Sequence, residues 1–187
     1  IFGQYCKRID GVVFKCLALD TNNYQSFLEG PHKLVVPPII KVIKTIHIPN
    51  IKIIDLSNTQ IRELPNNCLE DCTSLSEIKL PNILEIIGNN CFNHCVNLRN
   101  IILPNSLKVI GNGCFIECGN LTSIDLSKTL IKELPNNCFK TCIALSEIKL
   151  PNILEIIGSN CFYHCINLTN IILPNSLKVI GNGCFIE

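Results

Sequence analysis

The chain repeats itself at two nested scales, and this repetition constrains its fold more than any other feature. Residues 56–117 return as residues 126–187, an offset of 70 residues. Each block holds three units of 24, 23 and 23 residues, and the six units begin at Leu56, Leu80, Leu103, Leu126, Leu150 and Leu173. Units of this length with leucine at fixed offsets are typical of solenoids, in which each unit buries its apolar face against its neighbours. The sequence therefore predicts one continuous stack of units.

A strand is expected near the end of each unit, where the pattern LxxIxL occurs, for example at Leu98–Leu103. Side chains alternate along a strand, so Ile101 should point into the core and Ile102 away from it. Pro104 has no N–H to donate and should therefore end the strand.

The rest of the unit is expected to return the chain to the next strand through a turn and a short helix. Gly88 should supply a backbone conformation that other residues resist. Residues 89–95 predict the helix, with Asn89 as its cap and with two cysteines and a phenylalanine on one face. These expectations describe an α/β leucine-rich repeat solenoid with stacked parallel strands, about 4.8 Å apart, and short outer helical segments.

The array does not extend regularly over the whole chain. Residues 34–55 look like degenerate, shortened repeats, and residues 1–33 fit either an N-terminal cap or the end of a preceding region. The array itself spans residues 56–187 and stops inside a unit, and the chain contains no methionine. We therefore expect the sequence to be a piece of a longer protein, so the lack of a leader peptide at its start is uninformative.

Cysteine is the most unusual part of the composition. Eleven of the thirteen cysteines fall at fixed repeat positions, as five C-x3-C pairs and Cys184. Free thiols in the core are the favoured interpretation, because cysteine is small, apolar and commonly buried. Disulfides fit less well, since residues four apart on a helix have Cβ atoms about 5–6 Å apart, beyond the ~3.5–4.5 Å of a bridge. Cys6 and Cys16, outside the repeat, could pair with each other.

Metal binding is the third interpretation of these cysteines. Two units add a histidine to the pair and so offer three possible ligands each; the sets are Cys91, His94 and Cys95, and Cys161, His164 and Cys165. The two histidines lie three units apart, roughly 14 Å by strand spacing, and cannot share one metal. Within one set, helical direction would keep the three side chains from converging, so no metal and no cofactor is expected.

Composition and motifs argue against several function classes. The net charge is +1 and 17% of the residues are charged, so no basic tract for nucleic acid or for a membrane surface is expected. The most apolar stretch, residues 34–54, is interrupted by prolines and lysines and is not expected to span a membrane. The sequence has no phosphate-binding glycine loop, H-E-x-x-H motif or nucleophile elbow. The chain is therefore not expected to be an enzyme.

The outward positions of the strands form the candidate binding surface, which we call the strand face. By alternation it comprises ten residues: Glu77, Lys79, Asn100, Ile102, Ser123, Asp125, Glu147, Lys149, Asn170 and Ile172. Ile102 and Ile172 would serve as apolar anchors for a protein partner. They recur three units apart, about 14 Å, which favours an extended or multivalent partner over a small molecule. The alternative is a solvated sheet without a partner.

The unit pattern LPxSLxxIGxxCFxxCxxLxxIxL is specific and covers residues 56–187. It is carried, for example, by Leu103–Gly111, Cys114–Cys118 and Leu121–Leu126. It resembles the BspA-like, or Treponema-type, leucine-rich repeats of bacterial and protozoan surface antigens. One departure is the residue before phenylalanine, which is usually alanine in that family and is cysteine in every unit here. The resemblance implies a solenoid that attaches to host proteins or other cells, without catalytic activity and without a fixed ligand-binding residue.

Two hypotheses of function follow from these observations. The first is a non-enzymatic protein-binding or adhesion module of a microbial surface antigen, at the cell surface or secreted, with a host protein or a second copy as its partner. The alternative is an intracellular scaffold for protein interactions in the cytoplasm, because thiol-rich interiors suit a reducing compartment.

Overall fold

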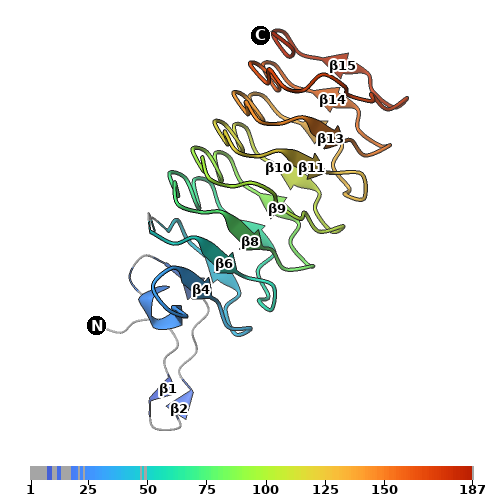
Figure 1. Ribbon diagram of the computed structural model, residues 1–187. Coiled ribbons are helices and arrows are strands. Elements are labelled where there is room, and N and C mark those ends of the chain that lie inside the picture. Colours follow the sequence, from blue (N-terminus) through green and yellow to red (C-terminus); the bar gives the residue numbers. More distant parts are fainter. Residues whose placement is uncertain are drawn as a thin grey trace.

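A computed structural model describes residues 8–9, 12–13, 18–20, 22, 24–46, 48 and 50–186. The chain winds as a stack of similar coils, with its two termini toward opposite ends of the stack (Figure 1). The described elements are β1 (Arg8–Ile9), β2 (Val12–Val13), β3 (Ala18–Leu19), the 3-10 helix η1 (Tyr24–Phe27), β4 (Lys33–Val35), β5 (Val42–Ile43), β6 (Ile53–Asp55), β7 (Glu63–Leu64), β8 (Glu77–Lys79), β9 (Ile86–Ile87), β10 (Val109–Ile110), β11 (Ser123–Asp125), β12 (Glu133–Leu134), β13 (Glu147–Lys149), β14 (Ile156–Ile157) and β15 (Val179–Ile180). Within these ranges no helix has the length and apolar character needed to cross a bilayer.

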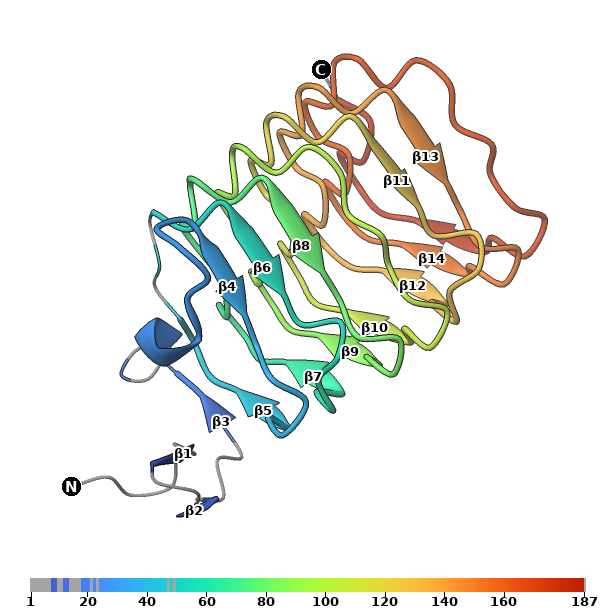
Figure 2. The ribbon, with the colours of Figure 1, turned by 60° about the horizontal axis from the view of Figure 1, so that its bottom comes forward.

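The strands stand in two rows along the stack (Figure 2). In the first row, the hydrogen-bonded sheets are β4-β6-β8 and β11-β13. In the second row, they are β3-β5, β7-β9-β10 and β12-β14-β15. Strands that neighbour one another within these sheets pair in parallel, each with the equivalent strand of the next coil. The predicted solenoid of stacked parallel strands is confirmed.

The N-terminal part joins the same rows. β4 pairs with β6 at an offset of 20 residues, which is shorter than the units that follow. Before it, β1 and β2 form an antiparallel pair. Much of the expected cap or preceding region, residues 1–33, lies outside the described residues, and so do Cys6 and Cys16.

The third side of each coil is a strip of turns, and the prediction of short outer helices is wrong. Residues 89–95 form successive turns, and Asn90 and His94 have positive φ angles of 52° and 60°. The equivalent positions of other coils share this conformation: Asn67, Asp71, Gly113, Glu117, Asn137, Thr141, Asn160, His164 and Gly183. A right-handed helix excludes a positive φ at every fourth residue, because that region places Cβ too close to the backbone. We call this side the turn strip.

Backbone hydrogen bonds in the turn strip run between coils and within them in alternation. The N–H of Phe92 donates to the carbonyl of Cys114 in the next coil (2.8 Å), and that of His94 donates to Ile116 (2.9 Å). The N–H groups between and after them turn back within the coil, as from Cys95 to the carbonyl of Phe92 (3.1 Å). Each coil therefore carries a third ladder in place of a helix. This ladder satisfies the backbone groups that a helix would have paired internally.

Asn89 links neighbouring coils and is not a helix cap. Its N–H donates to Oδ1 of Asn66 in the preceding coil (2.8 Å), and its own Oδ1 accepts the N–H of Asn112 in the next (2.7 Å). The same bond joins Ser159 to Asn136 in the second block (2.7 Å). The side chain that suggested a cap therefore ties three coils together.

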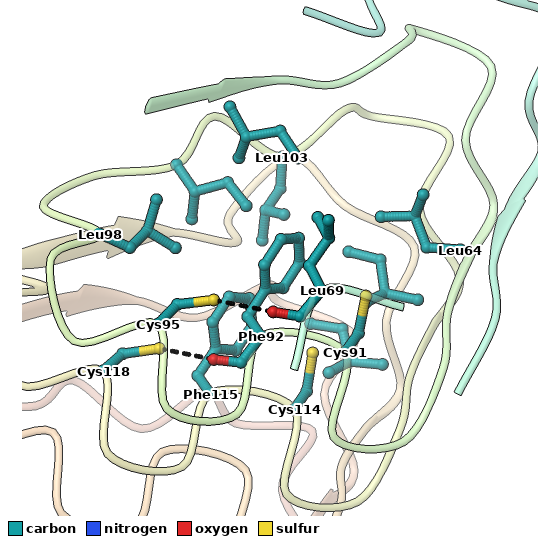
Figure 3. Close-up of a cluster of buried hydrophobic side chains, with 14 of the residues drawn as sticks. Leu64, Leu69, Cys91, Phe92, Cys95, Leu98, Leu103, Cys114, Phe115 and Cys118 are labelled. Carbon is teal, nitrogen blue, oxygen red and sulfur yellow. Dashed lines mark hydrogen bonds between the residues drawn. The ribbon is translucent and has the colours of Figure 1, made fainter. Parts of the chain in front are cut away.

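Phenylalanines stack through the core in one column. Phe92, Phe115, Phe139 and Phe162 lie in successive coils, and their ring centroids are 5.3, 5.3 and 5.6 Å apart. Their planes are within 9° of parallel, and all four rings are buried. Leucines and isoleucines from both strand rows surround them (Figure 3). Since every coil buries its apolar residues against the next, the core is one continuous column.

The repeat cysteines are free and buried, in agreement with the favoured interpretation. The second thiol of a pair donates to a carbonyl of the preceding coil, as from Cys118 Sγ to the carbonyl of Phe92 (3.2 Å; Figure 3). That carbonyl already accepts the N–H of Cys95, and the thiol therefore occupies its second lone pair. Sequence analysis placed these thiols in the core but missed this role.

Burial makes the thiols poor acids. It raises the pKa to about 11 in Cys72 and Cys184 and to about 12 in Cys165, against about 9 for a free thiol. The pKa is also raised by burial in six deeper thiols, namely Cys91, Cys95, Cys114, Cys118, Cys138 and Cys142. The thiolate is the reactive form, so these groups are inert in the folded chain.

Gly88 and Gly111 are required for space, which corrects the expectation of an unusual backbone conformation. Neither has a positive φ. A Cβ on Gly111 would lie 2.3 Å from the backbone N of Asn89, and one on Gly88 would lie 2.6 Å from that of Asn66. The glycines therefore let neighbouring coils approach at the corner where the second row meets the turn strip.

We predict that Gly111→Ala destabilises the fold, because the added methyl group would displace backbone of the preceding coil. The free energy of unfolding should fall by at least about 1–3 kcal/mol, the usual cost of overpacking. Urea unfolding followed by circular dichroism measures it. Gly119→Ala is the matched control, since its Cβ would meet nothing closer than 3.9 Å. Equal effects of the two substitutions would contradict the role assigned to Gly111.

We also predict that stability falls steeply above pH 9. The unfolded chain releases thiol protons near pH 9, while the folded chain keeps them to about pH 11 or higher. A raised folded pKa stabilises below the unfolded pKa, and this contribution is lost as the pH rises toward the folded pKa. Each such thiol adds a slope of about 1.4 kcal/mol per pH unit. Urea unfolding in reducing buffer between pH 8 and about 10.5 measures the slope.

The control for the alkaline slope is a variant in which Cys91, Cys114 and Cys138 are replaced by alanine. It keeps every tyrosine and lysine that titrates in the same range, and it should show a shallower slope. A free energy of unfolding that is flat across this range, or equal slopes in the two chains, would contradict burial of neutral thiols.

Candidate protein-binding face

The strand face lies on the outside of the first row, as alternation predicts. Nine of its ten residues are exposed and Ser123 is half-buried, whereas Ile78, Ile124 and Ile148 between them are buried. Six of the ten stand on β8, β11 and β13, and the other four lie at 100–102 and 170–172. Ile102 is 87% exposed and Ile172 is 88% exposed, the highest fractions among the large apolar side chains.

The third position of each first-row segment forms an ordered outer column. Register places Asp55 beside Lys79 and Asp125 beside Lys149 in adjacent coils. With the two isoleucines, the column reads Asp55, Lys79, Ile102, Asp125, Lys149, Ile172. Sequence analysis missed Asp55, because the regular pattern begins only at Leu56. The alternation of Ile51–Leu56 was the signal that could have found it.

Charges on the strand face are only loosely paired. Lys79 Nζ lies 3.9 Å from Asp55 Oδ2 and 3.8 Å from Glu77 Oε1. Lys149 Nζ lies 4.0 Å from Asp125 Oδ2 and 3.4 Å from Glu147 Oε1. Exposed pairs at such distances contribute little to stability. These groups therefore keep hydrogen-bonding capacity for a partner.

The second row contrasts with this arrangement. Glu85 accepts from both Arg62 and Lys108 at 2.6 Å, and Lys178 donates to Glu155 at 2.6 Å. The hydrogen bond from Lys108 holds the pKa of Glu85 below its usual value. The second row therefore uses its charges within the chain, and the strand face has more of its charge available.

Asp125 is held in its ionised form on the strand face. The hydroxyl and the N–H of Ser127 both donate to Asp125 Oδ1, at 2.6 and 2.9 Å. These bonds lower the pKa of Asp125, first through the hydroxyl and then through the backbone N–H. The carboxylate is therefore charged at neutral pH and has a fixed orientation.

The strand expected at Leu98–Leu103 does not form, although the alternation persists. Ile101 and Leu103 are buried and Ile102 is exposed, but residues 100–102 pair with neither β8 nor β11, and residues 170–172 are likewise outside the described sheets. First-row pairing crosses the 24-residue steps from β6 to β8 and from β11 to β13. Second-row pairing crosses 23-residue steps and stops at the 24-residue step between β10 and β12. Unit length therefore decides which row closes its ladder.

Shallow hollows flank Ile102 at this interruption. One of about 170 Å³ is lined by Ile102 together with Lys79 and Asn82, and one of about 390 Å³ by Ile102 together with Asp125 and Lys128. Ile102 therefore stands between a basic and a mixed hollow on an otherwise regular face. A partner side chain could seat beside it on either side.

The metal interpretation does not fit the arrangement of its residues. His94 lies on the outside, with Nδ1 3.2 Å from Asp71 Oδ1 and Nε2 2.6 Å from Glu117 Oε2. Cys91 and Cys95 point into the core. The three side chains therefore do not converge. At His164 the position of Asp71 is taken by Thr141, so the two histidines also differ in their surroundings.

Solved structures share the fold of this chain. A leucine-rich repeat protein of T. pallidum is 23% identical, with a TM-score of 0.55, and the match covers 87% of this chain and 75% of that one. A leucine-rich cell surface protein of Faecalibacterium prausnitzii is 21% identical, with a TM-score of 0.62 and coverage of 82% and 40%. A leucine-rich repeat protein of Eubacterium ventriosum is 18% identical, with a TM-score of 0.54 and coverage of 82% and 58%. This chain thus spans less than two thirds of the last two.

Sequence comparison identifies the family. A search of curated proteins finds no match. The BspA type leucine-rich repeat region, in contrast, matches residues 62–187 in six copies. This range contains the whole repeated pattern except the first residues of its first unit, and the stacked coils agree with it. The chain therefore belongs to the BspA-type leucine-rich repeat family.

Proposed function

We propose that this chain is a protein-binding module of a microbial surface antigen, that it serves adhesion, and that it binds through the strand face. The observation that carries this proposal is the exposure of Ile102 and Ile172, at 87% and 88%, amid loosely paired charges. Large apolar side chains with hollows beside them are typical anchors of protein interfaces. The family, and a fold shared with a protein described as a cell surface protein, support the surface assignment.

The spacing of the two anchors favours a partner of extended or repeated structure. Ile102 and Ile172 lie three coils apart, roughly 14 Å at the usual strand spacing. A partner that reaches both would meet the same surroundings twice, with an aspartate and a lysine on the coils between them. Two modest contacts of this kind reinforce each other when they are linked.

Binding without catalysis is part of the proposal. The thiols are the strongest nucleophiles of the described chain, and burial keeps them protonated inside the core. Both ring nitrogens of His94 are engaged by carboxylates. Neither group is therefore available for attack on a substrate at the surface.

An intracellular scaffold is the second candidate function. The observation that favours it is the set of free repeat thiols, which suits a reducing compartment. Their burial weakens this argument, since thiols that are neutral and enclosed resist oxidation at the cell surface as well. Both candidates use the same strand face, and labelling of intact cells with an antibody to the chain separates them.

We predict that Ile102→Asp and Ile172→Asp together abolish partner binding without loss of stability. Removing two anchors should weaken binding at least tenfold, or ~1.4 kcal/mol. Binding of the recombinant chain to immobilised extracellular-matrix proteins and to intact cells measures this. The matched control is Val109→Asp with Val179→Asp, two exposed second-row residues that are also one block apart. The proposal fails if the two double variants bind alike, or if the unaltered chain binds neither probe.

A further inference from the structure

The outer column of the strand face reads as its own complement when it is reversed. It contains Val35, Asp55, Lys79, Ile102, Asp125, Lys149 and Ile172, one residue from each successive coil. From Ile102 toward one end the order is lysine, aspartate, valine. Toward the other end the order is aspartate, lysine, isoleucine. At equal distances from Ile102, opposite charges therefore correspond, and apolar residues correspond to apolar residues.

This order fits a two-fold symmetric contact. An isologous interface brings the same patch of two copies together, so the patch must complement itself. A two-fold axis parallel to the strands, passing at Ile102, reverses the order of the coils and keeps the outer column opposite the outer column. Lys79 then faces Asp125 of a second copy, Asp55 faces Lys149, and Val35 faces Ile172. Ile102 meets its own counterpart at the axis.

We propose that a partner of the strand face is a second copy of this chain, packed antiparallel with Ile102 at the two-fold axis. This proposal rests on the proposed function, because it names one partner of the same face. It commits to a homotypic contact with four charge pairs, two from each copy. The duplication of the block generates it, since the aspartate, lysine and isoleucine return in the same order.

The charged groups in question are available for such a contact. The side chain of Lys79 is 54% exposed and that of Asp125 is 57% exposed, and their oppositely charged neighbours within the chain are 3.8 to 4.0 Å away. Asp125 is held ionised by Ser127. Across the interface, each could form a shorter, charge-assisted hydrogen bond. The pairs would also steer two copies into one register.

The inner column of the strand face tolerates the same arrangement. Asn100 would meet its own counterpart, and two amides can exchange hydrogen bonds. Glu77 would face Ser123, which can donate from its hydroxyl. The aliphatic part of Glu147 would lie over Ile53, with its carboxylate at the solvent edge. No position places two like charges opposite each other.

The size of the face predicts weak association. Seven coils span six steps of about 4.8 Å, or about 29 Å, and three strand residues are about 10 Å wide. The contact is therefore a few hundred Å² per copy, below the ~800 Å² of stable complexes. Such a contact is transient between single copies and becomes effective where many copies lie on one surface.

Charge reversal with rescue is the central experiment. The chain should dimerise reversibly in sedimentation velocity, and less so at high salt. Lys79→Asp alone and Asp125→Lys alone should each weaken dimerisation at least about tenfold, because two favourable pairs become two like-charge contacts. An equimolar mixture of the two variants should dimerise again, since the aspartate introduced in one chain then faces the lysine introduced in the other. Singles that associate normally, or a mixture that stays monomeric, would overturn the proposal.

The register is tested by cysteine cross-linking. With a mild oxidant, Ile102→Cys should give a disulfide-linked dimer, because the two new thiols meet at the axis. Ile172→Cys should give none by itself and should cross-link only when mixed with Val35→Cys. The unaltered chain controls for its own cysteines. Cross-linking of Ile102→Cys only with Ile172→Cys would place the axis between β11 and β13 and overturn this register.

The same variants separate this proposal from the proposed function. If the unaltered chain remains monomeric at every concentration yet binds matrix proteins or cells through Ile102, the homotypic contact is wrong and the binding module stands. If it dimerises with the expected rescue but binds neither probe, the partner is another copy and the host-directed part of the proposed function is wrong. Monomeric behaviour without any binding removes both.

Discussion

Backbone hydrogen bonds between neighbouring coils of the turn strip are the constraint on which the rest of the structure depends. They place Phe92 over Phe115 and bring the thiol of Cys118 to the carbonyl of Phe92. They also bring the coils so close that Gly111 has no space for a side chain. A helix on this side would pair its N–H groups within one coil and leave the coils to be joined by side chains alone. The ladder makes the stack continuous on three sides.

The two strand rows divide the remaining work between stability and display. The second row closes its ladder through most 23-residue steps and uses its charges in close pairs, such as Lys108 with Glu85. The first row loses its pairing at 100–102 and leaves Ile102 and its neighbouring charges exposed. One residue more or less in the turn between the rows shifts the pairing from one row to the other. The block of three units therefore returns both an open step and an apolar anchor to the same face.

Much of this architecture could be predicted from the sequence, because repeat length and alternation are local signals. Burial of Ile101 and exposure of Ile102 follow from the strand pattern alone. The turn strip could not be predicted, since a helix and the observed turns both bury Cys91, Phe92 and Cys95. What separates them is the acceptor of the Phe92 N–H, which belongs to the next coil. The close approach at Gly111 is likewise a property of two coils and is invisible in one unit.

The most direct test of this account is to measure which carbonyl accepts the N–H of Phe92. Scalar couplings across hydrogen bonds, recorded by NMR on the deuterated, isotope-labelled chain, connect an amide nitrogen to the carbonyl carbon of its acceptor. The account predicts a coupling from Phe92 to Cys114 and one from Phe115 to Cys138. A coupling from Phe92 to Gly88, its acceptor in an α-helix, would contradict the account.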